Sequence, residues 1–191
     1  MNIGIFSGSF NPVHIGHLIL ANYIVEFTEI EEVWFVVSPL SPLKSEKELS
    51  DERIRLKMVE LALKKYTRMK ASDFELSMPK PSYTIDTLNA LKEKYPEHTF
   101  SLIIGADNWS YFENWKEHDK ILENYSLKVY PRLGFRISIP NKLKTKVEAL
   151  DSPIIEVSST FIRESIKVDK DIRAFLPDNV YEYIIENKLY K

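Results

Sequence analysis

The residues with the clearest chemical potential are two histidines near the start of the chain. His14 and His17 lie three positions apart in the stretch "GIFSGSFNPVHIGHLILANYI", and the chain has only four histidines. Because residues three apart share one face of a helix, both imidazoles should lie on the first turn of the helix expected there. The start of a helix also presents unpaired N–H groups and the positive end of the helix dipole. We therefore expect this pair to bind a phosphate group during its transfer.

Other uses of the histidine pair fit the sequence less well. A zinc site usually has a third ligand, and no "HEXXH" pattern is present. The loop before the pair, "SGSFNP", matches neither the dinucleotide fingerprint G-x-G-x-x-G nor the P-loop G-x-x-x-x-G-K-[ST]. A nucleophilic triad cannot be identified from sequence alone. The remaining alternative is structural, with the imidazoles merely capping and packing their helix.

A second group of polar residues lies near the end of the chain, in the stretch "VSSTFIR" at residues 157–163. Ser158, Ser159 and Thr160 place hydroxyl and N–H groups at the expected start of a helix, and Arg163 follows one turn later. An anion-binding helix start and a forked guanidinium are suited to a triphosphate. A plain helix cap is the alternative explanation.

Alternating strand-like and helix-like stretches indicate the scaffold that positions these groups. Strands are predicted at residues 3–6, 32–38, 70–76, 99–105, 126–130 and 153–157. Helices are predicted at residues 17–27, 50–65, 81–96, 158–166 and 178–190. This alternation predicts an α/β fold with a Rossmann-like, doubly wound parallel sheet and C-terminal helices. With the strand order 3-2-1-4-5, the exits "SGSFNPVHIGH" and "GADNW" would face one crevice, where such sheets bind ligands. The region 131–152 has no clear pattern.

Length and composition exclude several classes of protein. The 191 residues suit one domain over 1–191, in which residues 158–191 would be a C-terminal helical part. A net charge of −2 argues against nucleic acid as a partner. The absence of cysteine excludes disulfides, cysteine-ligated metals and a cysteine nucleophile. No apolar run approaches eighteen residues and no signal peptide is apparent, so we expect no membrane partner and a cytoplasmic location. A homo-oligomer is compatible with the sequence.

Four motifs together resemble a known group of enzymes. The pattern "GxFxPxHxGH" at residues 8–17 is similar to the signature of the nucleotidyltransferase superfamily, which class I aminoacyl-tRNA synthetases share. A synthetase would be longer and would carry a "KMSKS"-like loop. The stretch "VSSTFIR" resembles the second signature of the small adenylyltransferases, "ISSTxIR". The stretches "PSYTIDTL" (81–88) and "IGADNWSYFENW" (104–115) resemble the bacterial nicotinate-nucleotide adenylyltransferases.

The resemblance implies a reaction and an ATP site. The enzymes of this family transfer the adenylyl group of ATP to nicotinate mononucleotide, which yields nicotinate adenine dinucleotide and pyrophosphate in NAD biosynthesis. His14 and His17 would be catalytic, as donors of hydrogen bonds to the α-phosphate. Mg²⁺ would accompany ATP, and no side chain is assigned as a metal ligand. The residues expected to bind ATP are Gly8, Ser9, Phe10, Gly105, Asp107 (on the ribose), Ser158, Ser159, Thr160 and Arg163.

The same resemblance implies a site for the mononucleotide. Trp115 would stack on the pyridine ring, and Tyr83 and Thr84 would offer backbone N–H groups to the nicotinate carboxylate. Lys44 and Arg132 would approach phosphate. Three alternatives stay open at this point: a preference for nicotinamide mononucleotide, a phosphopantetheine-type transferase, and a non-catalytic nucleotide-binding relative.

Some positions depart from the pattern of the family. Ser7 replaces a usual glycine, Ser9 a usual threonine and Asn11 a usual aspartate. Leu43 replaces a usual histidine, which removes a candidate phosphate contact. The stretch "PRLGF" at residues 131–135 stands where "RPGY" is usual.

Overall fold

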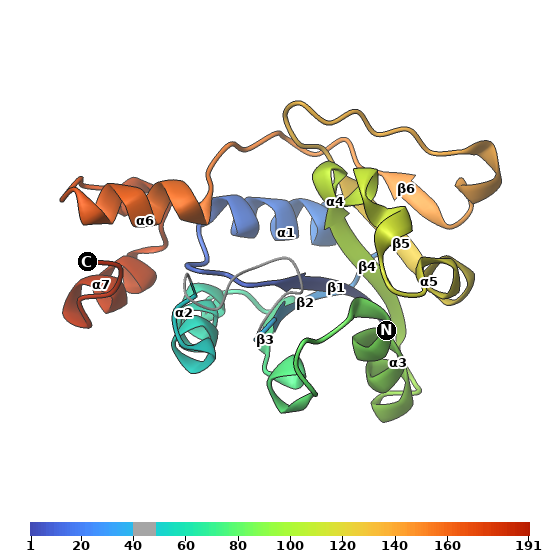
Figure 1. Cartoon of the computed structure of the whole chain (residues 1–191), viewed down its shortest axis with the longest axis horizontal. Helices are drawn as coiled ribbons and strands as arrows, with labels where there is room; N and C mark the ends of the chain where they lie inside the picture. Colours follow the sequence, from blue (N-terminus) through green and yellow to red (C-terminus); the bar gives the residue numbers. More distant parts are fainter. Residues whose placement is uncertain (40–48) are drawn as a thin grey trace.

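A six-stranded parallel β-sheet forms the centre of the computed structural model, which describes residues 1–39 and 49–191 (Figure 1). Every neighbouring pair of strands is parallel, and their order is β3-β2-β1-β4-β5-β6. The first five strands thus have the order considered in the sequence analysis, and β6 is added at one edge. Since the order reverses between β1 and β4, the exits of these two strands lie side by side. The strands are β1 (Asn2–Gly8), β2 (Glu32–Val37), β3 (Met69–Ser72), β4 (Thr99–Gly105), β5 (Ser126–Tyr130) and β6 (Val147–Ala149).

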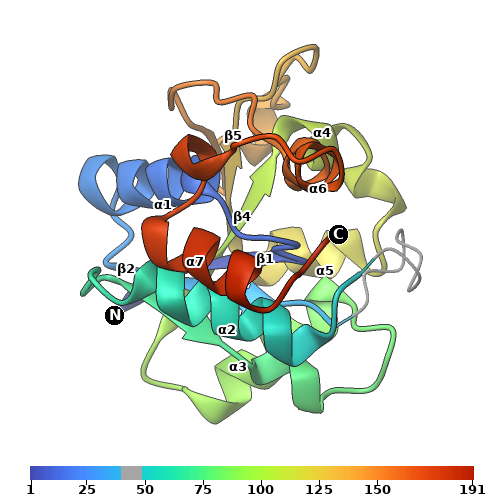
Figure 2. The same ribbon diagram turned by 90° about the vertical axis from the view of Figure 1, so that its left-hand side faces the viewer.

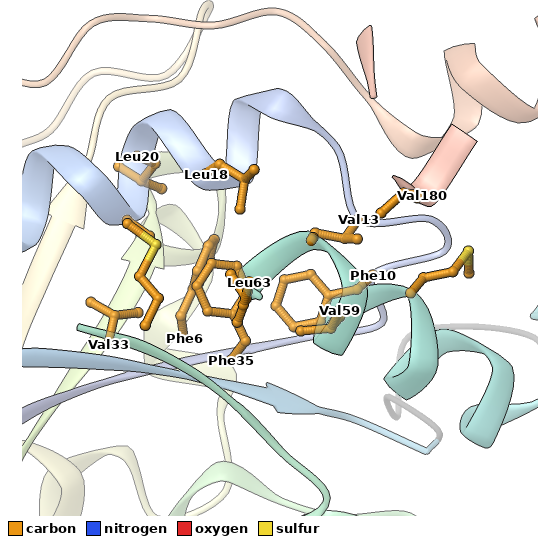
Figure 3. Close-up of a cluster of buried hydrophobic side chains, with 14 of the residues drawn as sticks. Phe6, Phe10, Val13, Leu18, Leu20, Val33, Phe35, Val59, Leu63 and Val180 are labelled. Carbon is orange, nitrogen blue, oxygen red and sulfur yellow. The ribbon is translucent and has the colours of Figure 1, made fainter. Parts of the chain in front are cut away.

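Alternate strand residues point to opposite faces of the sheet and build two hydrophobic cores. Phe6 and Phe35 point to the face covered by α1 and α2, and Ile5 points to the face covered by α3 and α5. Figure 3 shows the rings of Phe6 and Phe35 facing Leu18 and Leu20 of α1. Helices on both faces make this the doubly wound α/β fold that the sequence predicts. The covering helices are α1 (Ile15–Phe27), α2 (Glu52–Leu63), α3 (Thr84–Lys94) and α5 (His118–Asn124).

The C-terminal helices pack at the end of the sheet where β1 passes into α1 (Figure 1). Ile162 of α6 and Val180 of α7 are buried in the same core as α1 and α2. Figure 2 shows α7 beside α2. Helices in this place can contribute to a site at the carboxyl ends of the strands. The segments are α6 (Ser159–Lys167), η5 (Arg173–Phe175) and α7 (Asp178–Glu186).

The strand predicted at 153–157 is wrong. The sixth strand is instead β6, which lies in the region without a clear sequence pattern and pairs Val147 with Leu127 of β5. Val147 is buried, whereas Ile154 is 51% exposed. Residues 153–157 therefore form a connection in which only Ile155 and Val157 are partly buried, and they pair with no strand of the described sheet.

The strand predicted at 70–76 ends early, and the helix predicted at 81–96 starts late. β3 ends at Ser72, whose hydroxyl accepts a hydrogen bond from the N–H of Phe74, and a turn of 3₁₀ helix, η2 (Phe74–Ser77), follows. Tyr83 has extended backbone angles, so α3 begins at Thr84. The other predicted helices are confirmed, with ends shifted by a few residues. Among the described residues, no helix is long and apolar enough to cross a membrane.

Candidate active site

The two histidines meet at the start of α1. His14 is the N-cap residue and has extended backbone angles, and His17 lies in the first turn. Their rings stack with centroids 3.7 Å apart and an interplanar angle of 28°. The backbone N–H of His14 donates to Nδ1 of His17 at 3.1 Å. Because Nδ1 accepts this bond, the neutral imidazole of His17 carries its proton on Nε2 and can donate it to a ligand.

His14 is held in its neutral form. Its side chain is buried, and burial, followed by the positive charge of Arg132, lowers its pKa from 6.5 to about 4. Within the described residues, Nδ1 of His14 is buried without a hydrogen-bond partner. A neutral imidazole offers one N–H donor at pH 7, which is suited to a phosphate oxygen.

The loop between β1 and α1 is held from the protein interior. Phe10 has φ +44°, a conformation uncommon for a bulky residue, and its buried ring packs edge-on against His17 with centroids 5.1 Å apart. A Cβ atom at Gly8 would lie 3.1 Å from that ring, so a glycine is favoured there. The ring of Phe10 therefore lies in the core and packs against His17 from the side of the protein interior.

Arg55 of α2 fastens the strand exits around this loop. Its guanidinium is almost fully buried and donates to the carbonyl oxygens of Ser9 (2.6 Å), Ser38 (2.8 Å) and Pro39 (3.0 Å). Its Nε donates to the carbonyl of Ser50 at 2.8 Å. Burial lowers the pKa of Arg55 below its ordinary value. One side chain therefore connects the exits of β1 and β2 with the start of α2.

The start of α6 is joined directly to the loop that carries the histidines. The hydroxyl of Ser159 donates to the carbonyl of Pro12 at 2.8 Å, and Nη1 of Arg163 donates to the carbonyl of Asn11 at 2.9 Å. Nη2 of Arg163 also donates to the hydroxyl of Thr160 at 3.4 Å. The two distant motifs thus form one structural unit.

The hydroxyl groups at the start of α6 are engaged within the protein. That of Ser158 caps the helix by accepting from the N–H of Phe161 at 3.1 Å. No acceptor among the described residues faces the N–H groups of Ser159 and Thr160. These N–H groups are the part of the motif that remains available to an anion.

The exit of β4 carries the third group of expected ATP-binding residues. Gly105 precedes the short helix α4 (Ala106–Ser110), and a Cβ atom there would lie 2.2 Å from Oδ1 of Asp107. The same Oδ1 lies 3.7 Å from Nε of Arg132. Arg132 lies over the ring of Tyr130 and, together with His14 and His17, lines a cavity of about 30 Å³.

A cavity of about 640 Å³ opens beside the histidine loop. Gly8, Ser9 and Gly105 line it from the exits of β1 and β4, and this volume suits a nucleotide-sized ligand. The expected mononucleotide residues Tyr83, Thr84 and Trp115 line the same cavity. The structure therefore brings three of the expected ATP residues and three of the expected mononucleotide residues to one cavity, whereas Phe10, Asp107 and the residues at 158–163 do not line it. Trp115 follows η3 (Phe112–Asn114) and also packs against the ring of Phe112, with centroids 5.4 Å apart.

A buried glutamate that the sequence analysis missed holds one wall of this cavity. Glu75 is 3% exposed and accepts hydrogen bonds from Ser82 (2.8 Å), Thr87 (3.0 Å) and Ser7 (3.2 Å). It thereby fastens the start of α3 to β1. Ser7, which departs from the pattern of the family, is explained by this contact.

A lysine that also lines this cavity compensates an acidic residue in the first turn of α3. Nζ of Lys116 lies 2.8 Å from Oδ2 of Asp86 and 4.7 Å from the centroid of the Tyr83 ring. Its hydrogen bond to Asp86 raises the pKa of Lys116 above its ordinary value. Lys116 lines the cavity.

The two expected phosphate contacts have different outcomes. Lys44 lies outside the described residues. Arg132 lines the small cavity beside the histidines instead, so its side chain faces the side of the site that carries Asp107.

The residues that sequence reasoning missed differ in the signal they left. Arg55 occupies the buried face of α2 with Met58, Val59 and Ala62, and a charged residue on an apolar stripe marks a buried anchor. Glu75 lies in the stretch "KASDFEL", and nothing in this stretch distinguishes it from a glutamate on the surface. Lys116 adjoins a motif but has no distinguishing pattern of its own.

Comparisons with known proteins identify the family of the chain. A family model described as cytidylyltransferase-like matches residues 5–165. The chain is 52% identical over 183 residues to a probable nicotinate-nucleotide adenylyltransferase of Bacteroides fragilis, covering 96% of this chain and 90% of that protein. It is 48% identical to the probable nicotinate-nucleotide adenylyltransferase of Flavobacterium johnsoniae, with both chains covered completely.

The fold also matches a solved structure. The nicotinic acid mononucleotide adenylyltransferase of Plasmodium falciparum, solved in complex with NaAD, superposes with a TM-score of 0.81 at 24% identity, over 99% of this chain and 97% of that one. This likeness establishes the fold, and the sequence relatives establish the family. The chain belongs to the nicotinate-nucleotide adenylyltransferases, within the cytidylyltransferase-like family.

Proposed function

We propose that this protein transfers the adenylyl group of ATP to nicotinate mononucleotide, with His14, His17 and Arg163 in the ATP site. The products are nicotinate adenine dinucleotide and pyrophosphate. One observation carries the assignment of residues: Arg163 and Ser159 hydrogen-bond to the carbonyls of Asn11 and Pro12, immediately before the stacked histidines. These two contacts attach the start of α6 to the loop that carries the histidines, and that loop also borders the large cavity through Gly8 and Ser9.

The reaction needs alignment more than proton transfer. The phosphate of the mononucleotide is already anionic, so its oxygen attacks the α-phosphorus of ATP directly. A bond forms between that oxygen and the α-phosphorus, and the bond from the α-phosphorus to the α,β-bridging oxygen breaks. The N–H groups of His14 and His17 would donate to the non-bridging α-phosphate oxygens, where negative charge must be stabilised.

The departing pyrophosphate requires positive charge. Arg163 and the free N–H groups of Ser159 and Thr160 would bind the β- and γ-phosphates. The described residues contain no cluster of three or more histidine, aspartate or glutamate side chains that could hold a metal. Mg²⁺ prefers phosphate and water oxygens with few protein ligands, so we propose that the triphosphate brings it. It would supply further charge neutralisation.

The start of α3 favours an acidic pyridine substituent. No acceptor among the described residues faces the N–H groups of Tyr83 and Thr84. These groups lie at the start of α3, which is the positive end of its helix dipole. Asp86 could oppose a carboxylate there, but Lys116 pairs with it at 2.8 Å. Trp115, on the same cavity, would stack on the pyridine ring. These contacts support nicotinate over nicotinamide.

The test is an acceptor comparison. The purified protein is incubated with ATP, Mg²⁺ and nicotinate mononucleotide, nicotinamide mononucleotide or phosphopantetheine, and pyrophosphate and the adenylylated product are followed. A carboxylate that gains even one charge-assisted hydrogen bond predicts a kcat/KM at least about tenfold higher for nicotinate than for nicotinamide.

A matched pair of variants separates the site from the scaffold. H17A removes the imidazole in the site. H98Q removes the imidazole of His98, which precedes β4 and so lies at the end of that strand away from the site. Only H17A should abolish most pyrophosphate release. A preference for the amide would overturn the nicotinate assignment, and absence of pyrophosphate with every acceptor would overturn the proposed activity.

A further inference from the structure

Tyr190 reaches back from the C-terminal segment to the loop that carries the histidines. Its hydroxyl donates to Oδ1 of Asn11 at 2.9 Å, across 179 positions of the chain. Its ring packs against the core shared by α1, α2 and α7. Its φ is +66°, a conformation that is unfavourable for a tyrosine. A strained backbone is kept where surrounding contacts impose it, which draws attention to what those contacts do.

Asn11 is the point at which several parts of the ATP site are joined. It is 2% exposed, and its Oδ1 also accepts from the backbone N–H of Ser50 at 3.3 Å. Its backbone carbonyl accepts from Nη1 of Arg163 at 2.9 Å. Tyr190 and Ser50 thus hold the side chain of the residue whose backbone carbonyl binds Arg163.

We propose that Tyr190 is a positioning residue for adenylyl transfer, which holds Asn11 so that Arg163 and the start of α6 face the histidine pair. The Tyr190 hydroxyl donates to Asn11, and Asn11 binds Arg163, so the influence of Tyr190 on the ATP site passes through Asn11. Burial raises the pKa of Tyr190 to about 12, so its hydroxyl remains a donor at every pH at which the enzyme would work. The inference rests on the proposed function only in naming ATP as the ligand of Arg163.

The test compares the removal of two hydroxyl groups from neighbouring tyrosines. Y190F removes the donor to Asn11, whereas Y183F removes a hydroxyl that has no hydrogen-bond partner among the described residues, from a partly buried ring on α7. Loss of one neutral hydrogen bond predicts a reduction of about threefold to tenfold in kcat/KM for ATP in Y190F. The KM for the mononucleotide should change by less than about twofold, and Y183F should match wild type.

Measurement at a temperature where both variants are fully folded separates positioning from stability. If Tyr190 had only a structural role, Y190F would lower the melting temperature and leave kcat and KM unchanged. A double variant tests the route: on an R163K background, Y190F should cost less than about twofold, because the group that it positions is already altered. Equal kinetics for Y190F and Y183F, or full additivity with R163K, would overturn the inference.

A binding readout keeps this inference apart from the proposed function. Titration calorimetry with ATP should show a dissociation constant about threefold to tenfold higher in Y190F than in Y183F, whether or not a mononucleotide reacts. If wild type releases no pyrophosphate, the proposed function fails while this comparison still decides the role of Tyr190. Unchanged ATP affinity in Y190F would overturn that role.

Discussion

Replacement of Glu75 by glutamine should weaken the binding of nicotinate mononucleotide and leave the binding of ATP unchanged. The carboxylate is 3% exposed and accepts from the hydroxyls of Ser7, Ser82 and Thr87 at 2.8–3.2 Å. Glutamine has the same shape but only one acceptor oxygen. Its NH₂ group would face the hydroxyl of Ser82 or those of Ser7 and Thr87, which would have to rotate.

The expected loss of stability follows from those three bonds. A hydrogen bond to a charged group contributes about 1.5–3 kcal/mol, and a neutral one about 0.5–1.5 kcal/mol. Three bonds weakened by about 1 kcal/mol each give about 3 kcal/mol, part of which is offset because a buried charge is removed. A net loss of about 1–3 kcal/mol in the free energy of unfolding should lower the melting temperature by roughly 3–10 °C at this chain length.

The kinetic effect distinguishes positioning from charge. If Glu75 acts by holding Ser82, and with it the start of α3, the KM for nicotinate mononucleotide should rise several-fold in E75Q and the KM for ATP should not. If its negative charge instead weakens binding of the nicotinate carboxylate, the KM for the mononucleotide should fall. The control is E60Q, on the exposed face of α2, where the pair with Lys57 is largely solvated. An E75Q variant that matches E60Q in melting temperature and both KM values would refute the reasoning.

Four further predictions concern the ATP site and the pyridine contact. H17A should lower kcat by about 10²–10³ with little change in ATP affinity, measured by steady-state kinetics and calorimetry. R163K should raise the KM for ATP and lower kcat, because a point charge replaces a forked guanidinium; unchanged constants would place Arg163 outside the site. W115A should weaken mononucleotide use by roughly 1–3 kcal/mol and ATP use less, whereas equal losses with a lower melting temperature would favour a core role. His14, neutral in the folded protein to about pH 4, should make the protein less stable as pH falls from 6.5 towards 4, by about 2 kcal/mol at pH 5 in urea unfolding, and H14Q should lack this dependence.

The sequence predicted correctly those helices and strands that are marked by a pattern within their own residues. The apolar runs of β1, β2 and β4 are strands because both of their faces are buried, and the helix predicted at 158–166 is present, with Ser158 as its cap. The strand at 153–157 failed because β-branched residues favour a strand only where a neighbour is available for pairing. The edge of β5 is taken by β6 instead, with Val147 opposite Leu127.

The contacts that hold the site together were beyond the reach of local patterns. Arg55 binds carbonyl oxygens at Ser9, Ser38 and Pro39, and carbonyls are present at every residue, so the sequence does not mark them. The bond from Tyr190 to Asn11 likewise depends on how α7 packs, which a single sequence does not encode as a pattern. The motifs predicted which groups would bind phosphate, and the tertiary structure shows the contacts that hold those groups.

The electrostatics of the histidine pair favour alignment as the source of catalysis. A general base works best with a pKa near the working pH, but burial and Arg132 lower the pKa of His14 to about 4. Such a group is a poor proton acceptor at pH 7 and a stable neutral donor. His17 is arranged in the same sense, because its Nδ1 is already occupied by the backbone N–H of His14. An attacking phosphate needs no deprotonation, so an active site built from fixed donors, held by buried anchors such as Arg55, suits this reaction.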